Sequence, residues 1–189
     1  HLTTLGRYLV HADLRGVDLT GLDLKKAHLR NADLSGARLD GADLSRAMIE
    51  GVTVEGISLH GARLEGVRFD FLDLSGVDLG DAVLPRASFR GSNLSGADLR
   101  RADLAQCQLE SAILEGADLS GASLRAGSLR GARFEGATLR AVDASSAVME
   151  ALELNGLDLS DAVLDGAQAD NVQLKGARLD RVSLRGAAL

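Results

Sequence analysis

The chain has 189 residues, enough for one domain or a short array of repeats, and its net charge of −6 argues against a general nucleic-acid binder. Hydrophobic residues make up 46% of the sequence but aromatic residues only 3%, so a core has to be built mainly from Leu, Ala and Val. No apolar run approaches membrane-spanning length, no signal-peptide pattern opens the chain, and the single cysteine excludes an intramolecular disulfide.

Residues 1–11 do not follow the pattern that governs the rest of the chain. Leu5, Tyr8 and Leu9 have the spacing of one helical face, and Thr4 is suited to the N-cap position. The repeat array that follows would expose apolar side chains and unpaired strand edges at its end, so a cap is expected there. We interpret residues 1–11 as an N-terminal cap or linker.

Residues 12–189 repeat a five-residue unit. The unit consists of a small residue, a position that is often Asp or Asn, a large apolar residue called the centre, and two positions that are polar or glycine. A period of five fits neither a helix nor a flat strand, so the chain has to turn once per unit. Strand alternation places the centre and the small residue inside, and the residues before and after the centre outside. The predicted core therefore includes Phe69, Phe89, Leu94, Leu99, Leu104 and Phe134.

The last position of the unit is the corner, and it holds 19 of the 22 glycines, the residue that best tolerates positive φ. One of the four corner classes that recur every 20 residues is glycine throughout, so four units form one lap. Units that cannot bury their apolar side alone have to stack, which predicts an all-β quadrilateral solenoid of about nine coils. The invariant corners include Gly36, Gly56, Gly76, Gly96, Gly116 and Gly136.

Several positions depart from the unit. Phe71 occupies a corner, where it either lies on the surface or anchors a partner. Pro85 occupies an outward position and lacks an N–H, so we expect a lost hydrogen bond between coils or a distorted wall there. Residues 141–154 have helical composition, yet the frame of five and the glycine spacing of 20 continue through them, which favours coil over an inserted helix. Leu152 and Leu157 are oversized for the small position, and we expect them to fill space left by nearby undersized centres.

The sequence offers no catalytic constellation. Cys107 is at an interior position, which favours an inert buried thiol over a nucleophile. There is no phosphate-binding loop and no GxSxG motif, and a filled rod offers no cleft. We therefore predict that the chain is not an enzyme and that it uses no cofactor and no metal. The histidines, none of which has metal-ligand spacing, are His1, His11, His28 and His60.

Each wall of the solenoid recurs every 20 residues, so the charges can be sorted by wall. Two adjoining walls hold most of the acidic excess, with 7 acids against 3 bases on one and 9 acids against 6 bases on the next. The first, called the Glu135 wall, contains Asp13, Asp33, Glu55, Asp73, Glu115, Glu135 and Glu153. The second, called the Asp78 wall, contains Asp18, Asp78, Asp98, Asp118 and Asp158. The predicted partner-binding residues are Asp78, Asp98, Asp118 and Phe71.

Triplets such as Ala32-Asp33-Leu34, Ala97-Asp98-Leu99 and Ala117-Asp118-Leu119 resemble the A(D/N)LXX consensus of the pentapeptide repeat family. The resemblance covers residues 12–189 and implies a right-handed quadrilateral β-helix, a bacterial source and a cytoplasmic location, with export by a non-classical route as an alternative. Some members of the family mimic a DNA duplex and bind DNA gyrase, which protects it from quinolones or peptide toxins.

Two functions are consistent with these features. The first is a non-enzymatic scaffold for protein partners within a larger bacterial protein, including a secretion-associated one, since the chain begins without Met and ends without a cap. Its solenoid ends offer a route to self-association, and we expect no direct binding to nucleic acid or membrane. The alternative is a gyrase-binding DNA mimic. Arginines such as Arg100 and Arg140 interrupt the acidic walls, and neither a C-terminal dimerising helix nor a projecting loop is evident, which favours the scaffold.

Overall fold

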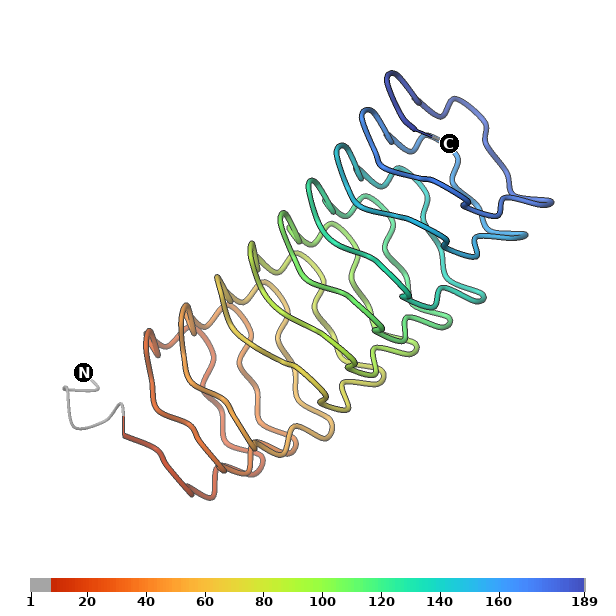
Figure 1. Ribbon diagram of the computed structural model, residues 1–189. Helices are drawn as coiled ribbons and strands as arrows, with labels where there is room; N and C mark the ends of the chain where they lie inside the picture. The colour runs from red at the N-terminus through yellow and green to blue at the C-terminus, as the bar shows by residue number, and fades with distance from the viewer. Residues whose placement is uncertain (1–7, 189) are drawn as a thin grey trace.

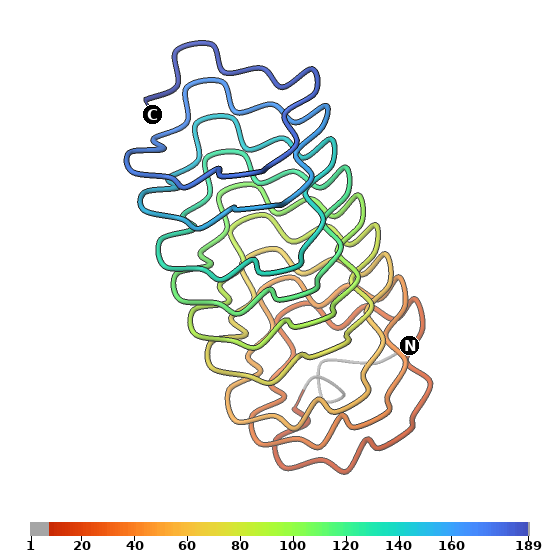
Figure 2. The same cartoon turned by 90° about the vertical axis from the view of Figure 1, so that its right-hand side faces the viewer.

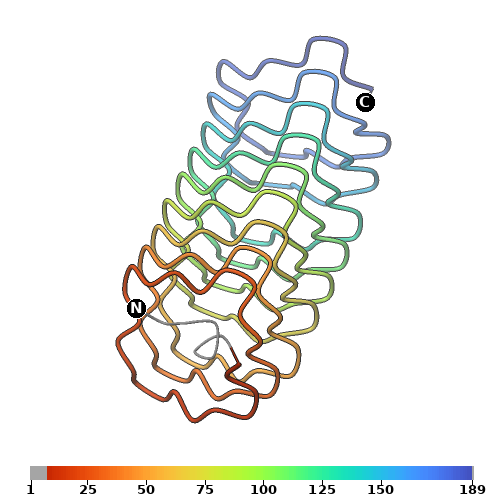
Figure 3. The same ribbon diagram turned by 90° about the vertical axis from the view of Figure 1, so that its left-hand side faces the viewer.

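The computed structural model describes residues 8–188, which form one stack of coils, with the first and last of these residues at opposite ends of a rod (Figure 1). The views from either side show the same coils rising from the N-terminal to the C-terminal end (Figures 2 and 3). Within residues 8–188 no helix and no continuous strand forms. The coils are instead joined by single-residue parallel β-bridges.

The bridges confirm the lap of twenty residues. Each one joins residues 20 apart in sequence, as in the consecutive pairs Asp78–Asp98 and Asp98–Asp118. Residues 8–188 therefore make about nine laps, each of four units. The segment 141–154 continues the coil, with bridges at Asp143 and Val148, which confirms the choice of coil over helix.

The coil begins earlier than the sequence pattern suggests. Tyr8 bridges His28, and the Leu9 N–H donates to the His28 carbonyl at 2.8 Å. His11 adopts the positive φ of a corner, 60°. Tyr8 and Leu9, expected on one face of a helical cap, are therefore already part of the first coil. The rest of the predicted cap, residues 1–7, lies outside the described residues.

The hydrogen bonds within one unit explain why the repeat is five residues long. In the unit 97–101, Ala97 N–H closes a turn onto the preceding centre at 3.0 Å, and Asp98 N–H donates to the preceding coil at 2.9 Å. Leu99 and Arg101 donate to the following coil at 2.8 and 3.0 Å. The remaining N–H, that of Arg100, donates to the side chain of Asp98 at 3.0 Å. All five backbone donors of the unit are thus satisfied, as a compact chain requires.

The corner is the third residue of each four-residue turn, where positive φ is needed. Every corner from residue 11 to residue 186 has φ between 53° and 74°, in glycines and in 17 other residues alike. The turn geometry therefore follows from the stacked coils, and glycine is favoured at the corner without being required there. Phe71, with φ of 62°, is the bulkiest residue held in this conformation.

The interior is filled as predicted. The predicted core residues, from Phe69 to Phe134, are all at most 3% exposed. The rings of Phe69 and Phe89 stack with their centroids 5.0 Å apart and an interplanar angle of 7°. Two voids along the axis have volumes of only about 10 Å³ each. The axis of the rod is therefore packed and dry.

The prediction for Pro85 is wrong. The bonds between coils around it are intact, because Leu64 N–H donates to the Val83 carbonyl at 2.7 Å and Gly66 N–H donates to the Pro85 carbonyl at 3.1 Å. Where the N–H after a centre is hydrogen-bonded, its acceptor is a side chain, and no residue at this position donates to the backbone of the neighbouring coil within residues 8–188. Proline at this position therefore removes no bond between coils.

The ladder of bridges is interrupted at two places within residues 8–188. No bridge joins residue 48 to residue 68 or residue 53 to residue 73, and none joins Arg133 to Glu153. In both cases the coil that follows the break carries a leucine at the small position, Leu72 in the first and Leu152 in the second. Each of these leucines lies one lap above a smaller residue, Val52 beneath Leu72 and Ala132 beneath Leu152, and its extra height accompanies the break. Leu152 itself is 1% exposed, so it faces inward as expected.

Candidate partner-binding surface

The aspartates that precede the centres hold the turns. Asp78, Asp98 and Asp118 each accept the backbone N–H of the residue two positions later, at 2.9, 3.0 and 2.9 Å. This is an Asx-turn, in which the side chain replaces a missing backbone acceptor. The same bond is made by every aspartate at this position, namely Asp13, Asp18, Asp23, Asp33, Asp43, Asp73, Asp78, Asp98, Asp103, Asp118, Asp143 and Asp158.

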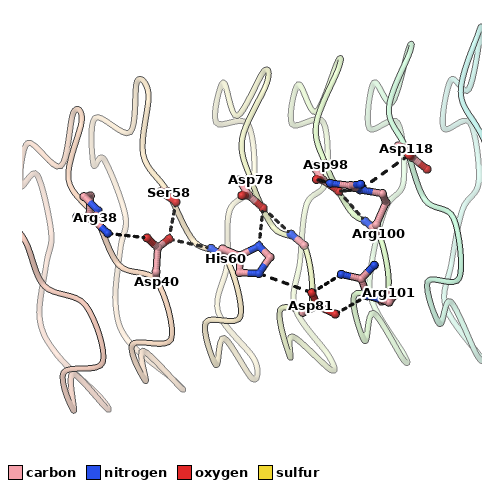
Figure 4. Close-up of polar contacts among 11 residues, drawn as sticks. Arg38, Asp40, Ser58, His60, Asp78, Asp81, Asp98, Arg100, Arg101 and Asp118 are labelled. Carbon is pink, nitrogen blue, oxygen red and sulfur yellow. Dashed lines mark hydrogen bonds and ion pairs between the residues drawn. The ribbon is translucent and has the colours of Figure 1, made fainter.

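The Asp78 wall brings three of the predicted partner-binding residues into one stack (Figure 4). Like charges on adjacent rungs repel, so the stack needs compensation. Arg100 supplies part of it: its guanidinium donates to both carboxylate oxygens of Asp98 and lies 4.0 Å from Asp118. The hydrogen bond from Arg100 lowers the pKa of Asp98 against the opposing effect of its partial burial.

The His60 ring lies between Asp78 and the corner residue Asp81, both in the following coil. Its Nδ1 lies 3.1 Å from Asp78 and its Nε2 lies 3.6 Å from Asp81, which in turn accepts two bonds from Arg101 at 2.7 and 2.6 Å. The hydrogen bond to Asp78 raises the pKa of His60, and the bond from Arg101 lowers the pKa of Asp81. Sequence reasoning considered His60 only as a metal ligand and missed this cluster. The signal was available, because residues 18 to 21 apart are neighbours when one lap is 20 residues.

A second kind of turn bond extends the same polar array. Asp40 accepts the hydroxyl of Ser58 and, at 3.2 Å, the backbone N–H of His60 in the next coil. Arg38 lies 3.6 Å from the same carboxylate (Figure 4). At Ser58, and likewise at Ser88, an aspartate of the preceding coil thus takes over the role of the aspartate before the centre. Asp165 repeats the arrangement with Ser183 and Arg185.

Phe71 lies apart from the three stacked aspartates. Its side chain is 81% exposed, and its ring covers the next corner, where a Cβ on Gly91 would approach two ring carbons at 2.8 Å. The unit 72–76 of the Glu135 wall separates Phe71 from Asp78. The four predicted residues therefore form two surfaces: a charged stack, and an apolar side chain beyond the intervening wall.

Other chemistry is restricted in the part of the chain that the structure describes. Cys107 is 1% exposed, and burial raises the pKa of its thiol to about 12, so little thiolate forms at neutral pH. Across residues 8–188, no three His, Cys, Asp or Glu side chains gather closely enough to hold a metal ion. Over the same residues, no helix has the length and apolar composition needed to cross a bilayer.

These features define a repeat solenoid whose interior is packed and whose function has to reside on its surface. The family model for pentapeptide repeats matches with eight copies, over residues 8–46, 42–81, 69–107, 102–140, 117–151 and 149–186. The chain belongs to the pentapeptide repeat family. A comparison with curated protein sequences gives no match.

Solved structures of the same family are similar to this chain. HetL of Nostoc sp. strain PCC 7120, involved in heterocyst differentiation regulation, is 31% identical over 96% of this chain and 90% of its own, with a TM-score of 0.47. Rfr23 of Cyanothece 51142 is 26% identical over 66% of this chain and 88% of its own, with a TM-score of 0.42. QnrB1, a plasmid-mediated fluoroquinolone resistance protein, is 20% identical over 88% of this chain and 85% of its own, with a TM-score of 0.42.

Proposed function

We propose that this chain is a non-enzymatic interaction module that presents the Asp78 wall to a protein partner. The observation that carries the proposal is the network from Arg38 to Asp118, in which carboxylates, guanidiniums and one imidazole are held in place by bonds to the backbone and to each other. Charged groups that are already fixed lose little conformational entropy on binding. Because the network carries both signs of charge, it favours a partner surface with a complementary pattern over a uniformly basic one.

Phe71 adds a second contact to this proposal. A large apolar side chain that is 81% exposed on a rigid corner can enter a partner's pocket without rearrangement. Its separation from the Asp78 wall requires a partner that wraps around an edge of the rod. Family membership further supports a right-handed quadrilateral β-helix for the coil, whereas the bacterial and cytoplasmic location stays a prediction.

The alternative, a gyrase-binding DNA mimic, calls for an array of unpaired carboxylates. On the Asp78 wall, Asp98 is paired with Arg100, and Asp81 with Arg101. These pairs lower the negative potential and favour the interaction module. A DNA supercoiling assay with bacterial gyrase separates the two functions, because a DNA mimic inhibits or protects the enzyme at micromolar concentration and an unrelated module leaves it unaffected.

The proposal is tested by replacing Asp78, Asp98 and Asp118 together with asparagine. Asparagine keeps the turn bond, as Asn93 does for Ser95 N–H at 3.1 Å, so the fold is retained while the charge is lost. In affinity capture from the source cell, we expect a partner that the parent chain retains and the triple variant loses. The matched control carries the same change at Asp43, Asp103 and Asp143 on the neighbouring wall. If both triple variants and Phe71→Ala retain the same proteins as the parent, the proposal is wrong.

A further inference from the structure

The second break in the ladder leaves backbone groups on both of its sides without a backbone partner. On the coil before it, the N–H groups of Phe134 and Gly136 and the carbonyl of Ala132 make no backbone bond among residues 8–188. On the coil after it, the same holds for both backbone groups of Glu153 and for the Asn155 carbonyl. The equivalent rungs one coil earlier are closed.

The break is an open cleft on the Glu135 wall. It has a volume of about 620 Å³ and is lined by Gly131, Arg133, Glu135, Ala151, Glu153 and Asn155. Figure 1 shows the wider spacing there, between the teal and light-blue coils. This volume is in the range of sites that hold ligands, roughly 300–1,000 Å³, whereas the voids on the axis are about 10 Å³.

The cleft is caused by a large side chain in the coil that follows it. Leu152 and Leu157 occupy two successive small positions, 1% and 6% exposed, where the coil before has Ala132 and Ala137. The next step is closed again, because Gln173 N–H donates to the Leu152 carbonyl at 2.8 Å. Leu157 lies over Ala137 in a step that stays bridged, at Thr138–Asp158, so the open rungs are confined to the Leu152 unit. The cleft stays open there because closing it would force Leu152 into Ala132.

We infer that this cleft is a binding site for an extended peptide, which enters between the two coils as an additional parallel strand. Unpaired N–H and carbonyl groups face the cleft from both sides, which is the requirement for main-chain recognition of a strand. A strand placed there restores the ladder on both of its edges. Backbone groups that are partly buried and unpaired cost free energy, and the inserted strand removes this cost.

The charges at the mouth indicate which peptide fits. Glu135 and Glu153 are exposed and make no ion pair with any described residue, whereas Arg133 is already paired with Glu115 at 2.5 Å. The mouth therefore has unpaired negative charge, and the site favours lysine or arginine at alternate positions of the strand. This site lies on a different wall from the Asp78 network, so it extends the proposed function without depending on it.

The first break, near Leu72, is a smaller version of the same device. Its cleft is about 390 Å³ and is also lined by a glutamate, Glu55, which is exposed. It lies four coils before the larger one on the same wall. We assign strand binding to the larger cleft.

The test uses a labelled octapeptide of alternating lysine and threonine, acetylated and amidated at its ends. Binding is followed by fluorescence anisotropy in about 150 mM salt, which is close to the physiological ionic strength. Threonine favours the extended conformation, and lysine matches the two glutamates. The control peptide alternates lysine with proline, which keeps the charge but removes half of the N–H donors. We expect at least tenfold weaker binding of the control, and equal binding of the two peptides would overturn the inference.

Variants of the chain locate the site. Leu152→Ala recreates the small side chain found in intact coils, closes the cleft, and should weaken binding at least tenfold. Val172→Ala makes a similar truncation one coil later, beside closed rungs, and should leave binding unchanged. If Leu152→Ala destabilises the fold, Glu153→Lys at the exposed mouth provides an independent test with the same expected loss. Unchanged binding in both variants contradicts the inference.

Hydrogen exchange of single amides provides a readout that is independent of charge. In the free protein the amides of Phe134, Gly136 and Glu153 should exchange at least tenfold faster than those of Leu114 and Gly116, whose bonds to the next coil are 2.7 and 2.8 Å. The lysine–threonine peptide should slow the first three amides selectively. Slow exchange of these amides in the free protein would show that the cleft is closed and would overturn the inference. The Asp78, Asp98 and Asp118 triple variant should bind the peptide normally, so failure here is distinct from failure of the proposed function.

Discussion

At the scale of single residues, an aspartate that precedes a centre has two roles that the sequence cannot separate. Its carboxylate closes the turn by accepting an N–H two residues later, and its second oxygen remains available at the surface. The acidic stack of the Asp78 wall thus arises from a structural requirement. Whether a given aspartate also contacts a partner depends on what pairs with that second oxygen.

Asp118 provides a direct test of the structural role. Asp118→Ala removes the bonds from Ser120 N–H at 2.9 Å and from the Ser120 hydroxyl at 2.5 Å, and we expect a loss of about 1 kcal/mol in the free energy of unfolding. Asp118→Asn keeps the acceptor and should lose less than half of that. Urea denaturation measures both values. An asparagine variant as unstable as the alanine variant would show that charge, and not the hydrogen bond, stabilises the turn.

His60 should titrate above its ordinary pKa because Asp78 accepts a hydrogen bond from its ring. A raised pKa means that the pairing stabilises the fold at low pH and that this contribution is lost as the pH rises through the folded-state value. Following the ring protons by NMR gives the pKa directly. In Asp78→Asn, which keeps the bond to Gly80 N–H, the pKa of His60 should fall. A pKa that is unchanged by this substitution would show that Asp78 is not the cause.

At the scale of one coil, side-chain size at the small position decides how closely neighbouring coils stack. Leu152 over Ala132 opens a cleft, as described above. At Cys107 the residue in the following coil is smaller, and the ladder stays closed. Gly127 stacks on Cys107, and a Cβ on Gly127 would lie 3.2 Å from the cysteine sulfur. The larger thiol is thus accommodated by the smallest residue in the following coil.

This pairing predicts coupling between the two positions. Gly127→Ala should cost about 1–3 kcal/mol because the added Cβ crowds the cysteine sulfur at 3.2 Å and the Leu124 carbonyl oxygen at 3.1 Å. In the double variant with Cys107→Ala, which stacks alanine on alanine as in other coils, the part of this cost that comes from the sulfur should disappear. A double-mutant cycle by urea denaturation measures the coupling. Additive effects of the two substitutions would contradict the size compensation.

At the scale of the whole molecule, each coil contacts only the coils before and after it, so stability accumulates along the rod. The carboxylates that hold the turns also contribute to stability in every part of the rod. The hydrogen bond from the Ser35 hydroxyl lowers the pKa of Asp33, and the bond from Arg15 lowers the pKa of Asp13 to about 2. Similar turns recur over the length of the chain.

These lowered values predict how stability depends on pH. A carboxyl with a lowered folded-state pKa stabilises the protein above its unfolded-state pKa and loses that contribution as the pH falls through the folded value. We therefore expect the urea midpoint to be maintained from neutral pH to about 4, the ordinary range of aspartate, and to fall as the pH approaches 2. Measuring the midpoint across this range tests the prediction, and a midpoint that rises on acidification below pH 4 would contradict it.

The sequence alone determined the lap of twenty residues, the inward centres and the corners, because stacking demands the same pattern in every unit. The same lap explains why the rings of Phe69 and Phe89, which are 20 residues apart, stack in the interior. The bond predicted to be lost at Pro85 is not lost. The turn geometry decides which N–H groups bond between coils, and the alternation of inward and outward side chains does not reveal it.

Only the tertiary structure decided what the surface does. Aspartates that look alike in sequence differ in what pairs with their second oxygen, and the side-chain packing decides that the His60 ring contacts both Asp78 and Asp81 of the following coil. The cleft before Leu152 likewise depends on which side chain of the preceding coil lies beneath the leucine. A five-residue pattern specifies positions along the chain, whereas these features depend on the packing of one coil against the next.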